Sequence, residues 1–276
     1  MNGTKRIINI TITVITVCKN SVKTLEAAIL SVLYQSYQSI EYIIIDGDSD
    51  DGTLEIIQKY SSQIKWVSEP DLGIYDAMNK GIRLATGDYI YFLGADDQLA
   101  RPDVILQVAE ELNRVHDLDI LYGRVLEVDR ELRLCRMSEG RISSSDVCQG
   151  VMIPHQAMFT RAILLRDIPF SLEYCVASDY EFLLRSIIAG RKIVFFDICI
   201  ALYCWNGLSG TGSICLEEYE DILKKWLPQS RSYQCKLRNE RLIRFLKKLT
   251  GSMGLSRIIK RRWRGWSEFP IEDDKS

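Results

Sequence analysis

Apolar residues recur along the first third of the chain with two alternating spacings, one typical of strands and the other of helices. Short runs rich in branched and aromatic residues predict strands at 7–17, 42–45, 64–67 and 89–93. Between these runs, apolar residues three or four positions apart predict helices that begin at Asn20 or Ser21, begin at Thr53, and span 75–85. Strands joined by helices form right-handed β-α-β units, so the pattern predicts a parallel sheet.

A later pair of strands departs from this alternation. Residues 120–128 and 132–137 are apolar runs that flank Asp129-Arg130-Glu131, an arrangement typical of an antiparallel hairpin. We therefore expect an α/β fold, with a mixed, mainly parallel sheet flanked by helices and an antiparallel hairpin at one side.

Polar side chains follow three of the predicted strands at the point where each strand ends. Lys19 and Asn20 follow the first strand, Asp46 the second, and Asp96 with Asp97 the fourth. Because the carboxyl ends of parallel strands share one edge of a sheet, we expect these groups to line one site. The neighbouring carboxylates of Asp96 and Asp97 repel each other, which favours a divalent cation or a polyhydroxyl ligand, with a solvated turn as the alternative. A G-x-x-x-x-G-K-[ST] phosphate loop is missing, and so is a G-x-G-x-x-G fingerprint after the first strand, which argues against kinase and dehydrogenase chemistry.

The composition is that of a globular protein that buries a full core. The chain has 276 residues, 47% of them hydrophobic, and its longest apolar run, 198–205, is far shorter than the ~20 residues of a membrane-spanning helix. Eight cysteines show no C-x-x-C pair, and only two histidines are present, which argues against a zinc site. We therefore expect a cytoplasmic protein with reduced thiols.

The C-terminal segment differs in charge from the rest of the chain. Within 236–266 eleven lysines and arginines accompany a single acid, Glu240, although the whole chain has a net charge of -2. Apolar residues at helical spacing and tryptophans among these charges are typical of a helix on an anionic membrane surface; a packed helix and a nucleic-acid patch are the alternatives. We expect one domain over 1–235 and a basic, amphipathic helical extension over 236–276, peripheral at the cytoplasmic membrane face, with no nucleic-acid partner.

Four segments occur in a distinctive order and spacing. They are ITVITVCKN, which ends at Asn20, IEYIIIDGDSDDGT (40–53), SEPDLGIYDAMNKGIRLATGDYIYFLGADD (68–97) and ASDYEFLLR (177–185). Together they resemble the inverting family 2 glycosyltransferases of GT-A fold, most closely the bacterial members that assemble polysaccharides. The resemblance covers most of residues 6–210 and implies a nucleotide-sugar donor, with a UDP-sugar favoured, and a glycan or lipid-linked acceptor.

The resemblance also implies roles for the polar residues at the sheet edge. The segment from Val17 to Lys19 and Asp46 would hold the base, with Asp46 accepting a hydrogen bond from a ring N–H. Asp96 would contact the ribose or the sugar. Asp97, the last acid of the family's D-x-D motif, would bind Mg²⁺ or Mn²⁺ that bridges the diphosphate and stabilises its charge as it leaves.

The chain departs from the family pattern at two positions. Where many members have D-D-G-S, this chain reads D-G-D-S from Asp46, so either Asp46 or Asp48 is expected to meet the base. Ala95 replaces the first acid of D-x-D, which leaves metal binding to Asp97 with Asp96 in support. Ala95 itself stays within the expected donor site.

The general base is expected at the start of a later helix. Asp179 lies in S-D-Y-E, which looks like the acidic motif of the family, and a carboxylate takes a proton from an attacking hydroxyl in ordinary acid–base catalysis. Ser178 and Glu181 also match a capping box, and in that alternative Asp179 only favours the helix dipole.

Three further residues are candidates for the donor site. His155, in I-P-H-Q-A-M-F, resembles a segment found near the donor sugar in related transferases, and a half-buried structural histidine is the alternative. Asn79 and Lys80 lie on the helix after Gly73 and are placed to reach the donor. The resulting hypothesis is metal-dependent glycosyl transfer; a sugar-nucleotide nucleotidyltransferase and a non-catalytic nucleotide-sugar-binding scaffold are the alternatives.

Overall fold

The computed structural model describes residues 10–204, 213–228 and 267–268, in which ten strands form a single sheet. The strands are β1 (Ile12–Cys18), β2 (Ile40–Asp46), β3 (Lys65–Ser68), β4 (Tyr89–Phe92), β5 (Gln98–Leu99), β6 (Ile120–Asp129), β7 (Leu134–Met137), β8 (Met158–Arg161), β9 (Ile193–Cys204) and β10 (Ser267–Glu268). The helices are α1 (Leu25–Leu33), α2 (Thr53–Lys59), α3 (Ile74–Leu84), α4 (Val104–Arg114), α5 (Ser144–Val147), the 3-10 turn η1 (His155–Ala157), α6 (Ala162–Asp167), α7 (Ser178–Ile188) and α8 (Ser213–Trp226).

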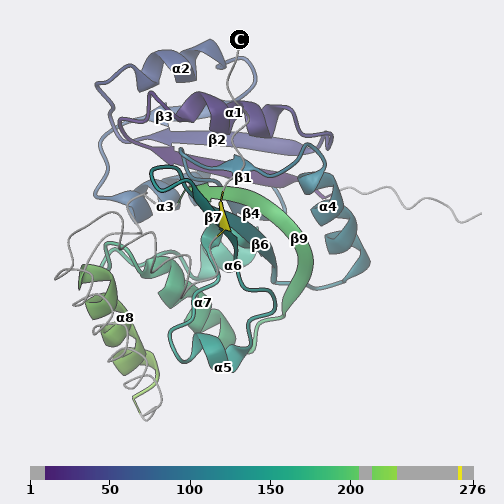
Figure 1. The fold of residues 1–276 in the computed structure, drawn as a ribbon, viewed down its shortest axis with the longest axis vertical. Helices are drawn as coiled ribbons and strands as arrows, with labels where there is room; N and C mark the ends of the chain where they lie inside the picture. Colours follow the sequence, from purple (N-terminus) through teal and green to yellow (C-terminus); the bar gives the residue numbers. More distant parts are fainter. Residues whose placement is uncertain (1–9, 205–212, 229–266, 269–276) are drawn as a thin grey trace, which may run out of the picture.

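The parallel half of the sheet has the strand order β4-β1-β2-β3. The chain therefore adds β2 and β3 on one side of β1 and then returns to add β4 on the other side of β1. Helices α1 and α2 lie on one face of these strands and α3 on the opposite face (Figure 1), as right-handed crossovers require. The predicted β-α-β units are confirmed.

The other half of the sheet is largely antiparallel. Strand β8 pairs antiparallel with both β4 and β6, and β6 pairs with β7 in the hairpin that the sequence predicted. Strand β9 runs parallel to β6 and also pairs with β5, so that it curves around this half of the sheet (Figure 1). The carboxyl end of β9 is thereby brought towards the carboxyl end of β4.

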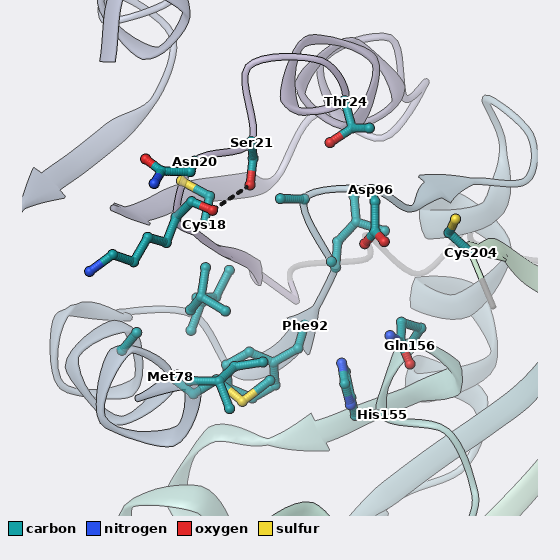
Figure 2. A pocket seen from close by; sticks show the side chains of 18 of the residues that line it. Cys18, Asn20, Ser21, Thr24, Met78, Phe92, Asp96, His155, Gln156 and Cys204 are labelled. Carbon is teal, nitrogen blue, oxygen red and sulfur yellow. Dashed lines mark hydrogen bonds between the residues drawn. The ribbon is translucent and has the colours of Figure 1, made fainter. Parts of the chain in front are cut away.

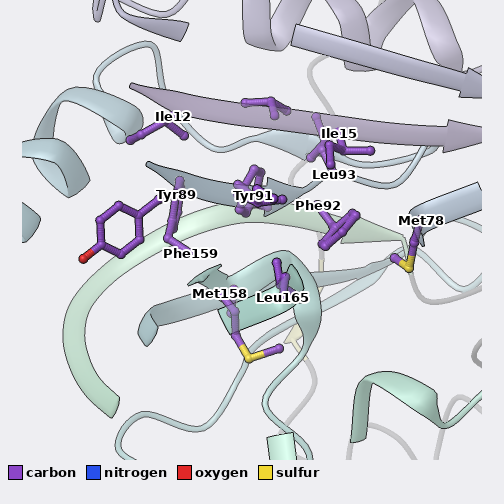
Figure 3. Close-up of a cluster of buried hydrophobic side chains, with 14 of the residues drawn as sticks. Ile12, Ile15, Met78, Tyr89, Tyr91, Phe92, Leu93, Met158, Phe159 and Leu165 are labelled. Carbon is purple, nitrogen blue, oxygen red and sulfur yellow. The ribbon is translucent and has the colours of Figure 1, made fainter. Parts of the chain in front are cut away.

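A continuous apolar core joins the two halves. Tyr91 of β4 lies directly opposite Phe159 of β8, and their rings stack with centroids 4.4 Å apart (Figure 3). On α1 the predicted apolar stripe is buried against the sheet at Leu25, Ala28, Ile29 and Val32. This core fixes the strand ends that carry the polar residues.

Two helix starts differ from the sequence prediction. Helix α1 begins at Leu25 rather than at Asn20 or Ser21, because the backbone of that preceding segment bonds to the turn after β2. Helix α7 begins at Ser178, but the capping box is not formed: Ala177 is the N-cap and the Ser178 hydroxyl has no hydrogen-bond partner among the described residues.

Most of the predicted basic extension, including 236–266, lies outside the described residues. Within the extension only Ser267–Glu268 is described, and it pairs antiparallel with β7. In the part of the chain that is described, no helix combines the length and apolar character needed to span a membrane.

Candidate active site

A cavity of about 760 Å³ opens at the carboxyl ends of β1 and β4. Two connections that diverge from this point bound it: the loop 19–24 after β1 and the loop 94–96 after β4. Ligands of open α/β sheets bind where the strand order reverses, which is the place of this cavity. The side chains of Met78 and Phe92 lie on its apolar floor, and Asn20 lies at the end opposite His155 (Figure 2).

The loop after β1 is held in place by the acidic turn after β2. The backbone N–H groups of Asn20, Ser21 and Val22 donate to Ser49 Oγ, Thr53 Oγ1 and Asp51 Oδ2, at 2.8, 2.7 and 3.1 Å. Asn20 adopts φ 52°, a left-handed conformation that asparagine tolerates, and its side chain accepts from the Asp50 N–H. The polar turn therefore shapes one wall of the cavity through backbone contacts.

Asp46 is fully buried and does not line the cavity. One of its carboxylate oxygens accepts from Ser49 Oγ and Cys18 Sγ, and the other accepts from the Ser49 N–H and Ser68 Oγ. Asp48 is exposed, with φ 63°, and it too lies outside the cavity lining. Neither acid that the sequence offered for the base faces the cavity.

A different carboxylate occupies the space beside Gly47. A Cβ atom at Gly47 would collide with Asp71 Oδ2, and it would lie 3.4 Å from Lys19 Cδ. Asp71 lines the cavity, and its other oxygen accepts from the Gly73 N–H at 2.9 Å. Asp71 thus lies where the second acid of a D-D-G-S sequence would project. The sequence reasoning missed this residue, whose signal is the P-D-L-G turn before α3.

The acids after β4 lie one behind the other. Asp96 lines the cavity, whereas Asp97 is 1% exposed and accepts from the Cys204 N–H at 2.8 Å and from Gln156 Nε2 at 3.0 Å. Burial raises the pKa of Asp96, and burial together with the neighbouring Asp96 charge raises the pKa of Asp97. A bound cation would stabilise the ionised forms of two such adjacent acids, so this position favours cation binding.

The described residues contain no cluster of three histidine, cysteine or acidic side chains that could by itself hold a metal ion. Mg²⁺ and Mn²⁺ do not need such a cluster, because one or two carboxylates suffice when substrate phosphates supply further oxygens. Asp96 and Asp97 therefore fit a cation of this kind that is bound together with its substrate.

Asp179 lies directly behind His155, which lines the cavity. Oδ2 of Asp179 is 3.0 Å from Nδ1 of His155, and Oδ1 accepts from the Tyr75 hydroxyl at 2.9 Å and from the Tyr180 N–H. Burial, together with the Asp179 carboxylate, holds the pKa of Tyr75 well above its ordinary value, so its hydroxyl remains a donor. The sequence reasoning missed the link between Tyr75 and Asp179, which lie 104 positions apart.

The remaining predicted donor residues divide into two groups. Val17, Lys19 and Ala95 line the cavity. Asn79 and Lys80 do not: both ends of the Asn79 amide bond the backbone of Phe170, and Lys80 Nζ donates to the Pro70 carbonyl and pairs with Glu69. These two residues anchor α3 to its surroundings.

Three acids from distant parts of the chain lie just behind the lining of the same cavity: Asp46, Asp97 and Asp179. Each contacts a residue that lines it: Asp46 contacts Cys18, Asp97 contacts Gln156, and Asp179 contacts His155. Further lining residues that the sequence reasoning did not select are Asp51, Asp71, Gln156, Tyr203 and Cys204.

Comparison with solved structures defines the class of fold. S. aureus TarS (residues 1–349) in complex with UDP-GlcNAc superposes with a TM-score of 0.62 at 18% identity, covering 80% of this chain and 67% of that one. The mannosyltransferase PcManGT from Pyrobaculum calidifontis, in complex with GDP-Man and Mn²⁺, gives a TM-score of 0.56 at 18% identity, covering 70% of this chain and 56% of that one. The curved mixed sheet is the GT-A fold.

Sequence comparison identifies the family. The family model described as "Glycosyl transferase family 2" matches residues 13–170. An uncharacterized glycosyltransferase of Mycobacterium tuberculosis is 36% identical over 209 residues, covering 74% of this chain and 77% of that protein. A PGL/p-HBAD biosynthesis glycosyltransferase of Mycobacterium bovis is 28% identical over 250 residues, covering 89% and 94%. The chain belongs to glycosyl transferase family 2, and the protein is a glycosyltransferase.

Proposed function

We propose that the protein is an inverting glycosyltransferase that moves a sugar from a nucleoside diphosphate, with UDP favoured, to a hydroxyl of a lipid-linked or growing glycan. The observation that carries this proposal is one cavity lined by Lys19 and Asp71, which meet beside Gly47, and also by Asp96 and His155. Its volume suits a nucleotide sugar. Complexes of TarS with UDP-GlcNAc and of PcManGT with GDP-Man support a donor of this class.

Asp71 is the proposed acceptor for the base, in place of Asp46 and Asp48. An ionised carboxylate only accepts hydrogen bonds, so it pairs with the ring N–H of uracil or guanine and not with the acceptor nitrogens of cytosine or adenine. Lys19, which borders the same space, supplies a positive charge that is available to the diphosphate.

Mg²⁺ or Mn²⁺ is proposed to bind at Asp96 and Asp97. The raised pKa values of both acids support this assignment, since a nearby cation would favour their ionised forms. When bound, such a cation neutralises charge on the departing diphosphate. The presence of Mn²⁺ with PcManGT is consistent with the proposal.

The proposed reaction is one displacement at the anomeric carbon. The acceptor hydroxyl attacks from the face opposite the diphosphate, the bond to the diphosphate oxygen breaks, and the configuration inverts. Asp179 and His155 together form the proposed base: with Nδ1–H donating to Asp179, His155 Nε2 receives the proton of the hydroxyl, and the Asp179 charge stabilises the resulting imidazolium. This arrangement explains why the carboxylate lies behind the cavity wall.

The variant Asp179→Asn tests this proposal. It is expected to lower turnover by about 100- to 10,000-fold, the usual contribution of general base catalysis. Nucleotide-sugar affinity is expected to stay within about threefold, because Asp179 does not line the cavity. Turnover is measured as nucleoside diphosphate released with Mn²⁺ from the most active of UDP-glucose, UDP-galactose, UDP-GlcNAc and GDP-mannose.

The matched control is Asp167→Asn, which removes an exposed carboxylate at the end of α6 and is expected to leave turnover unchanged. Wild-type turnover in Asp179→Asn would refute the assigned role. Release of pyrophosphate would instead indicate a nucleotidyltransferase, and persistence of full activity in EDTA would refute the metal assignment.

The basic segment 236–266 is proposed to hold the enzyme at the anionic cytoplasmic face of a membrane, close to a lipid-linked acceptor. Its composition supports this, because each lysine or arginine near such a surface contributes ~1 kcal/mol to binding.

A further inference from the structure

Helix α7 carries the proposed base, yet its own sequence does little to cap its first turn. Its N-cap residue is Ala177, which has no polar side chain, and the hydroxyl of the following Ser178 has no partner among the described residues. The first N–H groups of a helix have no partner within the helix, so their bonds must come from elsewhere. Asp179 is the second residue of α7 and moves with this first turn.

The backbone that leads into α7 is instead held by a different helix. The carboxylate of Glu218 in α8 accepts hydrogen bonds from three consecutive backbone N–H groups. Oε1 accepts from the Cys175 N–H at 2.7 Å, and Oε2 accepts from the Val176 N–H at 2.9 Å and the Ala177 N–H at 3.0 Å. A carboxylate at this place also faces the positive end of the α7 dipole. Hydrogen bonds to a charged group are stronger than those between neutral groups, so this contact fixes the backbone that enters α7.

Other contacts keep α8 aligned along α7. The rings of Tyr219 and Tyr180 stack with centroids 4.2 Å apart, and Trp226 Nε1 donates to Glu181 Oε1 at 2.8 Å. Glu181 is 2% exposed, so this second bond is buried. Together with Glu218, these contacts hold the first turn of α7, and Tyr75 bonds Asp179 in the same turn.

We infer that Glu218 is a positioning residue for the proposed base, acting on Asp179 through the three backbone amides that lead into α7. The inference rests on the proposed function of Asp179. Its physical basis is that the geometry of proton transfer tolerates little error, since a displacement of ~1 Å can cost ~100-fold in rate. Glu218 itself does not line the cavity and is not assigned any contact with substrate.

The test compares three substitutions on α8. Glu218→Ala removes the acceptor for all three amides and is expected to lower kcat by about 10- to 100-fold, with KM for the donor within about threefold. Glu218→Gln keeps one acceptor oxygen and is expected to recover at least half of that loss on a logarithmic scale. Glu217→Ala removes an exposed charge one residue earlier and is the matched control, expected to behave as wild type.

Amide hydrogen exchange provides a readout that does not require turnover. The amides of residues 175–177 are expected to exchange faster in Glu218→Ala than in Glu217→Ala, while those of β1 and β4 remain protected. Unchanged protection at 175–177 would overturn the inference. If Glu218→Ala loses protection throughout the protein, Glu218→Gln becomes the deciding variant. Wild-type exchange together with wild-type kcat in Glu218→Gln supports the inference. A lower kcat without faster exchange at 175–177 overturns it.

The double variant Asp179→Asn/Glu218→Ala separates this inference from the function on which it rests. Because Glu218 acts through Asp179, the double variant is expected to be no slower than Asp179→Asn within about twofold. Multiplied losses would overturn the positioning role. An inactive Asp179→Asn together with a fully active Glu218→Ala would overturn only this inference, whereas an active Asp179→Asn would refute the proposed base.

Discussion

Gly47→Ala is the sharpest test of the proposed base-recognition site. The backbone of Gly47 does not have a positive φ, so alanine is compatible with its conformation. The added methyl group would occupy the position of Asp71 Oδ2. Since that oxygen is the end of a flexible side chain, the carboxylate is expected to rotate away while the backbone stays in place.

The expected effect therefore falls on donor binding and not on folding. Loss of one hydrogen bond between the Asp71 carboxylate and a base N–H costs about 1.5–3 kcal/mol, which corresponds to a weakening of UDP binding of about 10- to 100-fold. Replacing a glycine in a compatible conformation stabilises the folded state by ~0.4–1 kcal/mol, which offsets the local crowding. The free energy of unfolding is therefore expected to change by less than ~1 kcal/mol.

Isothermal titration calorimetry with UDP and with GDP, each with Mn²⁺, measures this effect. Asp71→Asn is expected to weaken binding similarly, and adding Gly47→Ala to it is expected to have no further effect. Gly140→Ala is the matched control, because its Cβ would crowd the Arg124 guanidinium, which lies outside the cavity lining. A folded Gly47→Ala variant that binds UDP with wild-type affinity would refute the role of Asp71.

Two further predictions concern stability and membrane attachment. Glu41 accepts from Thr13, Lys65 and Thr86. Burial raises the pKa of Glu41, but these bonds outweigh it and lower the pKa to about 2. The resulting stabilisation is complete above about pH 4.5 and is lost as the pH falls towards 2. Glu41→Gln is therefore expected to lower the free energy of unfolding at pH 7 by ~1–2 kcal/mol after allowance for solvent screening, and to flatten the decline of that free energy between pH 4.5 and 2. Urea unfolding measures both, and curves of unfolding free energy against pH that run parallel for the two proteins would contradict this. A chain that ends at Leu237 is expected to lose cosedimentation with anionic vesicles, and unchanged binding would assign the basic segment to packing on the domain.

The stability prediction for Glu41 and the binding prediction for Gly47 separate the two ends of the parallel strands. Glu41 is the second residue of β2 and joins β1, β2 and β3 at their amino ends. Gly47 follows β2 at its carboxyl end, beside the cavity. Glu41→Gln is therefore expected to leave UDP affinity unchanged.

The sequence by itself determined the order of the parallel strands and helices and the edge at which polar residues gather. Apolar runs and helical spacing are local patterns, because side chains alternate in strands and recur every three or four positions in helices. The topology rule for open sheets then placed Lys19 and Asp96 at one cavity without knowledge of any distance.

Only the tertiary structure decided which acid faces the cavity and which lies behind it. Asp46 ends β2 and Asp97 follows β4, yet the carboxylate oxygens of both accept hydrogen bonds from residues distant in the chain, such as Ser68 and Gln156. Asp71 takes the space left by Gly47, and Glu218 binds the amides that lead into a helix that begins 40 positions earlier, at Ser178. Side-chain direction and such long-range hydrogen bonds depend on how whole elements pack, and no local sequence pattern contains that information.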